Sequence, residues 1–237
     1  MSTFSATIAL PRFWFGALAS ASLCSAMLLV GPGAARAVAQ QAAPHASESE
    51  AAASQIAAFA RAWAGITSYD ATVTMEDKKG TQSQSVAFEY RFRKPSNVTV
   101  HVIAGQNTGV TLTWDGGPTV VAWRGSGFAA LFKKTLSLHD PLVTTLRGSS
   151  IGDVSFAAIL AQGQSDAGSL SEAPGEVIGG TPTDAVTLVR SASPTDGGVT
   201  REVVELSVVT HLPMRVLSYE DSALVQDVEF SNVKVDR

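Results

Sequence analysis

The amino-acid sequence predicts an α+β protein in which helical and strand-forming segments are grouped rather than interleaved. One amphipathic helical stretch, 48–64, comes first, and five segments with period-two alternation follow it, joined by short turns. An unpatterned region over 124–164 then separates them from a second block of alternating segments. Because parallel sheets are built from alternating strands and helices, this grouped order favours an antiparallel sheet.

Residues 1–39 are predicted to be a secretory signal peptide. The start carries one base and no acid up to Arg12, the run 13–30 is apolar, and a Gly-Pro-Gly break leads into small residues. Two Ala-x-Ala sites place cleavage after Ala37 or Ala39, and the sequence leaves that choice open. An uncleaved membrane anchor is the alternative, since the apolar run approaches spanning length. We expect export to the periplasm.

The composition excludes several classes of protein. Of 237 residues, 45% are hydrophobic and 16% are charged, which suits a packed core and argues against disorder. The net charge of −4, with scattered basic residues, provides no electrostatic footprint for nucleic acid. The one cysteine, Cys24, falls in the predicted signal peptide, and the four histidines lack metal-ligand spacing. We therefore expect no disulfide, metal or other cofactor.

A single domain is predicted over 47–237, after a flexible lead at 40–46. The pattern from Ser47 to Glu50 has the form of a capping box, which marks the start of a helix. The helix over 48–64 carries one apolar stripe, and Gly65 ends it. The stripe consists of Ile56, Phe59, Ala60 and Trp63.

Five strands in succession predict an antiparallel meander. The second is the clearest, because aromatic and apolar residues alternate with charged and small ones. Asp115-Gly116-Gly117-Pro118 is typical of a tight hairpin. The predicted strands are 69–75, 86–93, 98–102, 110–114 and 119–123.

The middle of the chain is predicted to be a helical insertion at 124–164. Its first part has apolar residues at helical spacing. Asp153 is expected to cap a second short helix that Gly163 stops, and residues 165–182 are expected to form a loop because they are rich in Gly, Ser and Pro. The first helical pattern consists of Phe128, Leu131, Phe132 and Thr135.

Alternation resumes in the last quarter of the chain. Turn-forming residues separate four further segments of strand-like pattern. These predicted strands are 184–190, 199–209, 213–220 and 224–235.

One sequence motif suggests catalysis. Gly148-Ser149-Ser150-Ile151-Gly152 has the G-x-S-x-G form of a nucleophile elbow, with His211 as the only histidine after Ser150. That motif is diagnostic on a strand-to-helix turn of a parallel sheet, and the predicted architecture is antiparallel. Serine hydrolysis through Ser150 stays a minor alternative, and we assign no catalytic residue.

Aromatic and aliphatic side chains on one face of the predicted sheet are the main candidate binding surface. Two interpretations stand: a core packed beneath the N-terminal helix, or a concave apolar pocket with the 124–164 insertion over it. The residues expected to line such a cavity are Phe88, Tyr90, Phe92, Val100, Leu112, Trp114 and Phe230.

Short patterns, in order, resemble the superfamily of periplasmic outer-membrane lipoprotein carriers, the LolA/LolB-like group, and its uncharacterised periplasmic branches. They are Ile66–Ala71 at the entry to the first strand, Phe92–Val98, Leu112–Gly117 and His211–Val216. The resemblance implies a strongly curved, half-open antiparallel sheet wrapped around helices that act as a lid. It also implies an acyl chain or another apolar ligand in the concavity. The 124–164 insertion departs from the best-known carrier.

The leading functional hypothesis is a monomeric, non-enzymatic periplasmic carrier or sensor. Its ligand is expected to be an acyl chain, a lipid or a lipoprotein, held in an apolar concavity. The alternative is a cell-envelope interaction or regulatory module with a filled core, which binds another envelope protein. The volume of the space beneath the sheet distinguishes the two hypotheses.

Overall fold

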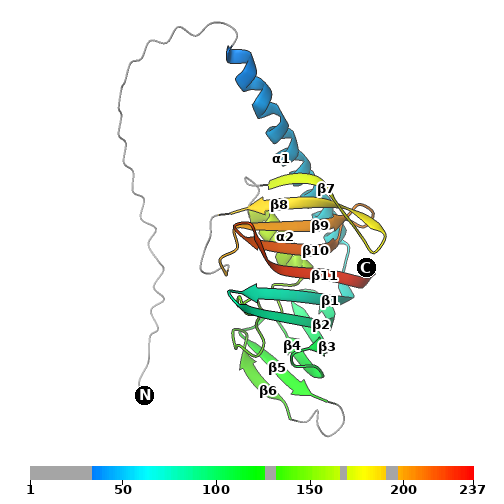
Figure 1. The fold of residues 1–237 in the computed structure, drawn as a ribbon. Coiled ribbons are helices and arrows are strands. Elements are labelled where there is room, and N and C mark those ends of the chain that lie inside the picture. The colour runs from blue at the N-terminus through cyan, green and yellow to red at the C-terminus, as the bar shows by residue number, and fades with distance from the viewer. Residues whose placement is uncertain (1–33, 126–131, 166–169, 191–196) are drawn as a thin grey trace, which may run out of the picture.

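The computed structural model describes residues 34–125, 132–165, 170–190 and 197–237, and for residues 34–46 it describes the backbone alone. Two helices and eleven strands form this part of the chain (Figure 1). The helices are α1 (Ala34–Ala64) and α2 (Phe156–Ser165). The strands are β1 (Ser68–Lys79), β2 (Gln82–Arg93), β3 (Asn97–Gly105), β4 (Val110–Trp114), β5 (Thr119–Arg124), β6 (Lys134–Ser137), β7 (Leu170–Ile178), β8 (Thr181–Val189), β9 (Arg201–Ser207), β10 (Pro213–Glu220) and β11 (Ala223–Asp236).

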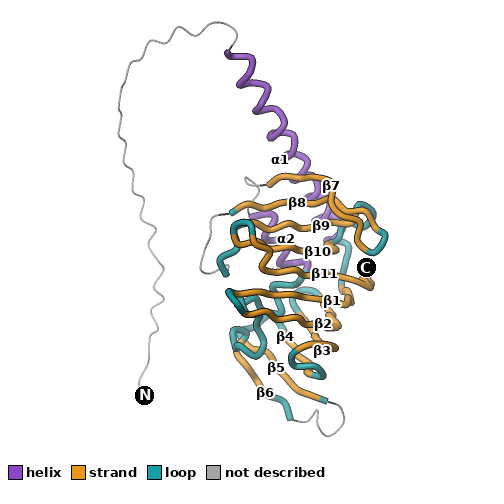
Figure 2. The backbone as a smooth tube through the Cα atoms, viewed as in Figure 1, coloured by secondary structure: helices purple, strands orange, loops and turns teal. Residues whose placement is uncertain are grey.

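All described strands belong to one antiparallel sheet in the order β6-β5-β4-β3-β2-β1-β11-β10-β9-β8-β7. The two blocks of strands meet where β1 pairs with β11, while β6 and β7 are the edges, so the sheet does not close. Figure 2 shows it curving around α2 and the lower part of α1. The predicted α+β class, with a curved, half-open antiparallel sheet around an N-terminal helix and a short central helix, is confirmed.

The concave face of the sheet carries the core. Period-two alternation in β1 and β2 points one set of side chains inward, where they are buried, and the other set outward. Phe156 of α2 stacks on Tyr69 of β1 with the ring centroids 4.2 Å apart and the planes 7° from parallel. The rings of Phe59, Trp63 and Phe230 lie edge-on around Phe156. This aromatic cluster attaches both helices to the sheet.

Helix α1 begins at Ala34, well before the expected start at residue 48. Residues 40–46, predicted to be a flexible lead, therefore lie within the helix. The stretch is rich in alanine and glutamine, which favour helix, and Pro44 does not end it. The C-terminus falls at Ala64, as Gly65 predicted, where Lys94 Nζ donates to the Trp63 carbonyl at 2.7 Å. The predicted signal peptide lies largely outside the described residues.

The first predicted helix of the middle region is partly corrected. Lys134–Ser137 forms β6, which pairs with β5, so Thr135 lies in a strand rather than in a helix. Phe128 and Leu131 lie outside the described residues. Pairing with an existing edge offers these few residues more backbone hydrogen bonds than an isolated helical turn would.

The second predicted helix exists as α2, but its ends differ from the prediction. The Ser155 hydroxyl, not Asp153, caps it, accepting from the Ala158 N–H at 3.1 Å. The Asp153 carboxylate instead accepts from the N–H and the hydroxyl of Ser150. Gly163 does not stop the helix. A Cβ there would lie 2.8 Å from the Ile56 side chain, so this glycine permits close packing of α2 on α1.

Residues 165–182 were expected to form a loop, yet β7 and the start of β8 lie within them. Pro174 and Gly175 occupy an edge strand. A proline is tolerated there because the N–H that it lacks is not needed to pair with a further strand. The register shifts between Pro174 and Val177, so the strand accommodates both residues at an irregularity. The remaining strands match their predictions apart from their ends.

Candidate functional site

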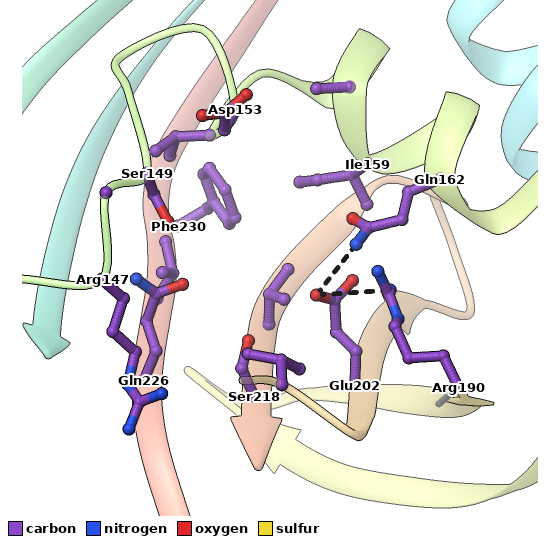
Figure 3. A pocket seen from close by; sticks show the side chains of 16 residues that line it. Arg147, Ser149, Asp153, Ile159, Gln162, Arg190, Glu202, Ser218, Gln226 and Phe230 are labelled. Carbon is purple, nitrogen blue, oxygen red and sulfur yellow. Dashed lines mark hydrogen bonds and ion pairs between the residues drawn. The ribbon is translucent and has the colours of Figure 1, made fainter. Parts of the chain in front are cut away.

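A cavity of about 350 Å³ lies between the concave face of the sheet and the chain that crosses it (Figure 3). Strands β9, β10 and β11 form one wall. Residues 147–154 and α2 form the other. Its apolar lining includes Val216, Val228 and Phe230 from the sheet and Ile159 from α2.

Polar side chains form a row across one end of the concave face. Asp77 of β1 pairs with Gln226 of β11, which pairs with Ser218 of β10, which pairs with Glu202 of β9. Asp77, Ser218 and Glu202 are buried, and the last three members of the row line the cavity. Directly opposite residues of an antiparallel sheet point to the same face, so this polar row is continuous over four strands.

The next inward-facing row on the same strands is apolar. Met75 pairs with Val228, Val228 with Val216, and Val216 with Val204. All four side chains are buried. The cavity wall is therefore banded, with hydrogen-bonding groups at one end and aliphatic groups deeper along the strands.

Three side chains from different elements meet at the polar end (Figure 3). Arg190 Nη2 lies 3.9 Å from Glu202 Oε2, and Gln162 Nε2 of α2 donates to the same oxygen at 3.4 Å. With the Gln162 amide rotated, its nitrogen lies 3.0 Å from Glu202 Oε1 and its oxygen 2.7 Å from Arg190 Nη1. The Arg190 and Glu202 side chains are only 14% and 10% exposed. This contact ties α2 to β9.

Arg147 bounds the same cavity from the other side. Its guanidinium donates to Glu220 at 2.7 Å, to the Lys78 carbonyl at 2.6 Å and to the Gly197 carbonyl, and its Nε lies 4.0 Å from the Asp77 carboxylate. The side chain is 6% exposed. Arg147 thus joins three turns at one end of the sheet to the chain that covers the cavity.

Both arginines that line the cavity already face carboxylates. Arg147 faces Glu220 and Asp77, and Arg190 faces Glu202. An anionic ligand group entering here would therefore lose hydration without gaining a new counter-ion. The electrostatics disfavour an anionic group at this end.

Asp77 gives the site a pH dependence. Burial raises the pKa of the Asp77 carboxyl, outweighing the hydrogen bond from the Arg147 N–H and the Arg147 charge. A raised folded-state pKa means that the stabilising contribution is present below the unfolded pKa and is lost as pH rises through the folded one. Asp77→Asn removes this titration. The free energy of unfolding of the variant minus that of the unchanged protein is therefore expected to rise from acidic to neutral pH. Urea unfolding across that range measures the difference, and a decrease with pH would contradict the expectation.

The structure separates the residues predicted to line a cavity. Phe230 lines the cavity described above. Phe88, Val100 and Leu112 line a second, smaller space of about 80 Å³ on the far side of residues 149–154. Its other apolar lining residues are Met75, Val86, Val102, Val110, Leu142, Val143, Ile151 and Val154, and its polar ones are Gln84, Gln106, Asn107, Thr144, Thr145, Ser149 and Ser150.

The other three predicted residues serve mainly in packing. Phe92 packs against the aromatic cluster, with its ring centroid 5.5 Å from that of Trp63. The Tyr90 hydroxyl donates to the Ile151 carbonyl at 3.0 Å. Trp114 Nε1 donates to the Gly117 carbonyl, and its ring lies so close to Gly152 that a Cβ there would be 2.7 Å away. Tyr90 and Trp114 thereby hold the covering chain against the sheet.

Sequence reasoning missed the polar end of the cavity. Glu202 is in phase with Val204 in β9, and Gln226 is in phase with Val228 in β11, so each is a polar residue on an apolar face. These polar residues on otherwise apolar faces were the signal available in the sequence. The pairing of the strands, which the sequence pattern did not give, places them side by side and so forms the polar end of the cavity.

The G-x-S-x-G motif lies outside the context that its chemistry requires. Ser150 follows a turn rather than a strand, and every described strand pair is antiparallel. The buried Ser150 hydroxyl donates to Asp153 at 2.9 Å, while His211 lies in the turn between β9 and β10. The motif thus shapes the start of α2, and these contacts assign no nucleophile.

In the part of the chain that the structure describes, neither α1 nor α2 has the length and apolar character needed to cross a membrane. Within the same ranges, no three His, Cys, Asp or Glu side chains gather closely enough to hold a metal ion.

Comparisons with known proteins find likenesses of fold. No protein-family model matches the chain, and no curated protein sequence matches it. The solved structures similar to it include the lipoprotein LppX of Mycobacterium tuberculosis, 17% identical, covering 79% of this chain and 99% of that one, with a TM-score of 0.45. LprF from Mycobacterium bovis is 15% identical over 78% of this chain and 93% of its own, with a TM-score of 0.46.

A LolA superfamily protein from Nitrosomonas europaea is 13% identical, covering 72% of this chain and 86% of that one, with a TM-score of 0.37. The likeness concerns the fold, so we derive the function from the geometry of this chain.

Proposed function

We propose that this protein is a non-enzymatic periplasmic carrier or sensor that binds a single amphipathic ligand beneath its sheet. The ligand has an acyl chain, supplied by a lipid or by a lipoprotein, and an uncharged polar head. The observation that supports this proposal is the banded wall, in which a polar row borders an apolar row inside a cavity of about 350 Å³. Cavities of roughly 300–1,000 Å³ are typical of small-molecule sites.

The two bands correspond to the two ends of such a ligand. Each methylene buried against the apolar row contributes about 0.8 kcal/mol, so a chain alone provides substantial affinity. Ser218, Gln226 and Gln162 supply uncharged hydrogen-bonding groups for a head bearing hydroxyl or ester oxygens.

The predicted export signal supports a periplasmic location. Removal of residues 1–39 would take away two arginines and no acid, leaving a net charge of about −6. Such a protein is repelled by anionic lipid surfaces, which favours transfer of the ligand through a protein partner. We expect the carrier to act as a monomer.

Filling the cavity is expected to abolish binding. Ala158 of α2 lines the cavity, so Ala158→Phe places a ring where the ligand chain would lie. We expect affinity for a fluorescent monoacylglycerol to fall at least about tenfold, which corresponds to about 1.4 kcal/mol. Fluorescence titration of the purified protein measures the change.

Ala161 provides a matched control for this experiment. It lies on the same helix and is exposed, so Ala161→Phe makes the same change outside the cavity. Its affinity is expected to stay within about twofold of the unchanged protein. Equal losses of affinity in both variants would contradict the site.

Native mass spectrometry gives a second test. Protein purified from its own compartment should retain a bound lipid.

A filled core in one part of the concavity favours a second candidate function. The aromatic cluster of Phe59, Trp63, Tyr69, Phe156 and Phe230 leaves α1 fixed against the sheet. If lipid is consistently absent from the purified protein, an envelope interaction module that binds another protein through its outer surface becomes the better description.

A further inference from the structure

Two spaces lie side by side beneath the sheet. The first compartment is the banded cavity of about 350 Å³ over β9, β10 and β11, and the second compartment is the space of about 80 Å³ over β1 to β4. Ser149 and Val154 line both. One short stretch, residues 149–154, therefore separates them, and we call it the divider.

The sheet beneath the divider is continuous and apolar. Val216 and Val228 belong to the first compartment, and Val228 pairs directly with Met75, which belongs to the second. Met75 pairs in turn with Val86. The next row repeats the arrangement, since Phe230 pairs with Val73 and Val73 with Phe88. A hydrocarbon chain that follows either row passes from one compartment into the other without meeting a polar side chain of the sheet.

The divider is held by a hydrogen bond of its backbone and by packing, and its aliphatic Val154 side chain makes no hydrogen bond. The Ile151 carbonyl accepts from Tyr90, and Gly152 packs against the Trp114 ring. Val154 is a buried aliphatic side chain between the two spaces, so a change in its position breaks no side-chain hydrogen bond. Shortening Val154 therefore enlarges both spaces at the place where they meet.

The second compartment is the more apolar of the two in its side chains. Its sheet wall from β1 to β4 is aliphatic and aromatic apart from Gln84 of β2, and no charged residue lines it. Its other polar residues lie in the turn after β3 and in the covering chain, so the end of a hydrocarbon chain that follows the apolar rows meets aliphatic and aromatic side chains of the sheet.

We infer that the ligand lies across the divider, with its head at the polar row of the first compartment and the end of its chain in the second. This inference rests on the proposed function and adds a basis for selecting ligands by the length of their acyl chain. Val154 sets how readily a chain crosses, and Phe88, Val100 and Leu112 set the longest chain that fits. The ligand is then a single-chain amphiphile with an uncharged head and a defined upper length.

A graded series of monoacylglycerols, from octanoyl to stearoyl, tests the inference. For the unchanged protein, affinity is expected to rise about fourfold for each methylene that becomes buried, and then to level off. Val100→Phe fills the second compartment, so affinity should level off at a shorter chain. Val154→Ala should raise affinity for the longest members relative to octanoyl by about fourfold or more.

For each variant, the affinity for each ligand is divided by the affinity of the same variant for octanoyl glycerol. This ratio cancels any general loss of folded protein. Val102→Leu adds less volume to the same compartment and provides a milder version of Val100→Phe. Val199→Ala is the matched control for Val154→Ala, because Val199 lines the first compartment alone. For Val199→Ala, the dependence of affinity on chain length should match that of the unchanged protein.

The possible failures are distinct. If the unchanged protein binds the series but all variants level off at the same chain length, the chain does not cross the divider and the inference is wrong. If the unchanged protein binds no member of the series, the proposed function itself fails.

Discussion

Phe156→Ala is expected to lower the free energy of unfolding by about 3–5 kcal/mol, the range for removing a large aromatic side chain from a core. Phe156 is fully buried. Its ring stacks on Tyr69 and contacts Phe59, Trp63 and Phe230, which come from α1 and β11. The substitution leaves a hole where both helices meet the sheet, and the neighbours, being rings, fill it poorly.

Urea unfolding followed by tryptophan fluorescence measures this loss, since Trp63 lies 6.3 Å from the Phe156 ring centroid. Phe132→Ala is the control, because the Phe132 side chain is 84% exposed. Its effect should stay within about 0.5 kcal/mol. Similar losses for the two substitutions would show that the aromatic cluster is not the centre of the core.

Arg147→Ala is expected to cost about 3–5 kcal/mol, because it leaves the buried Asp77 carboxylate without its nearby cation. It also removes hydrogen bonds to Glu220 and to the carbonyls of Lys78 and Gly197. Hydrogen exchange should accelerate in residues 140–154, since this stretch loses its attachment to the turns of the sheet. Arg147→Lys keeps the charge without the planar fork, so we expect an intermediate loss.

Arg91→Ala is the exposed counterpart of this substitution. Arg91 pairs with Asp70 at 2.7 Å, yet the two side chains are 70% and 50% exposed. The expected loss is below about 1 kcal/mol. Asp77→Asn introduced together with Arg147→Ala should recover part of the Arg147→Ala loss, because no buried charge then remains unpaired. Additive losses in that pair of variants would contradict a direct coupling between Arg147 and Asp77.

Local pattern was sufficient for most of the strands. In β2, Phe88, Tyr90 and Phe92 alternate with polar residues, and such alternation has meaning only for a half-buried strand. The hairpin at Asp115 to Pro118 was predictable because its turn chemistry is local. The order of helix and strand blocks then sufficed for the α+β class.

The missed elements owe their structure to tertiary contacts. β6 forms because β5 offers an edge, and β7 forms along β8 despite Pro174 and Gly175. Local propensity opposed both assignments. The early start of α1 was missed for another reason, because the capping pattern at Ser47 to Glu50 competed with an alanine-rich stretch that continues the helix.

The candidate site was only half predictable. Apolar alternation identified Phe230, Phe88, Val100 and Leu112 as inward-facing side chains, and all four line a space beneath the sheet. The polar row of Asp77, Gln226, Ser218 and Glu202 depends on the register of four strands, and register is not a local property.

The open sheet has two ends, and each is unsuited to pairing with a second molecule. At one end β6 offers only four residues, among them Lys134, with Lys133 just before it. At the other, Pro174 and a register shift interrupt β7, and α1 packs along that strand. Short, charged or interrupted edges disfavour the strand-to-strand aggregation to which unclosed sheets are prone. The sheet can therefore stay open around its cavity without becoming a template for fibrils.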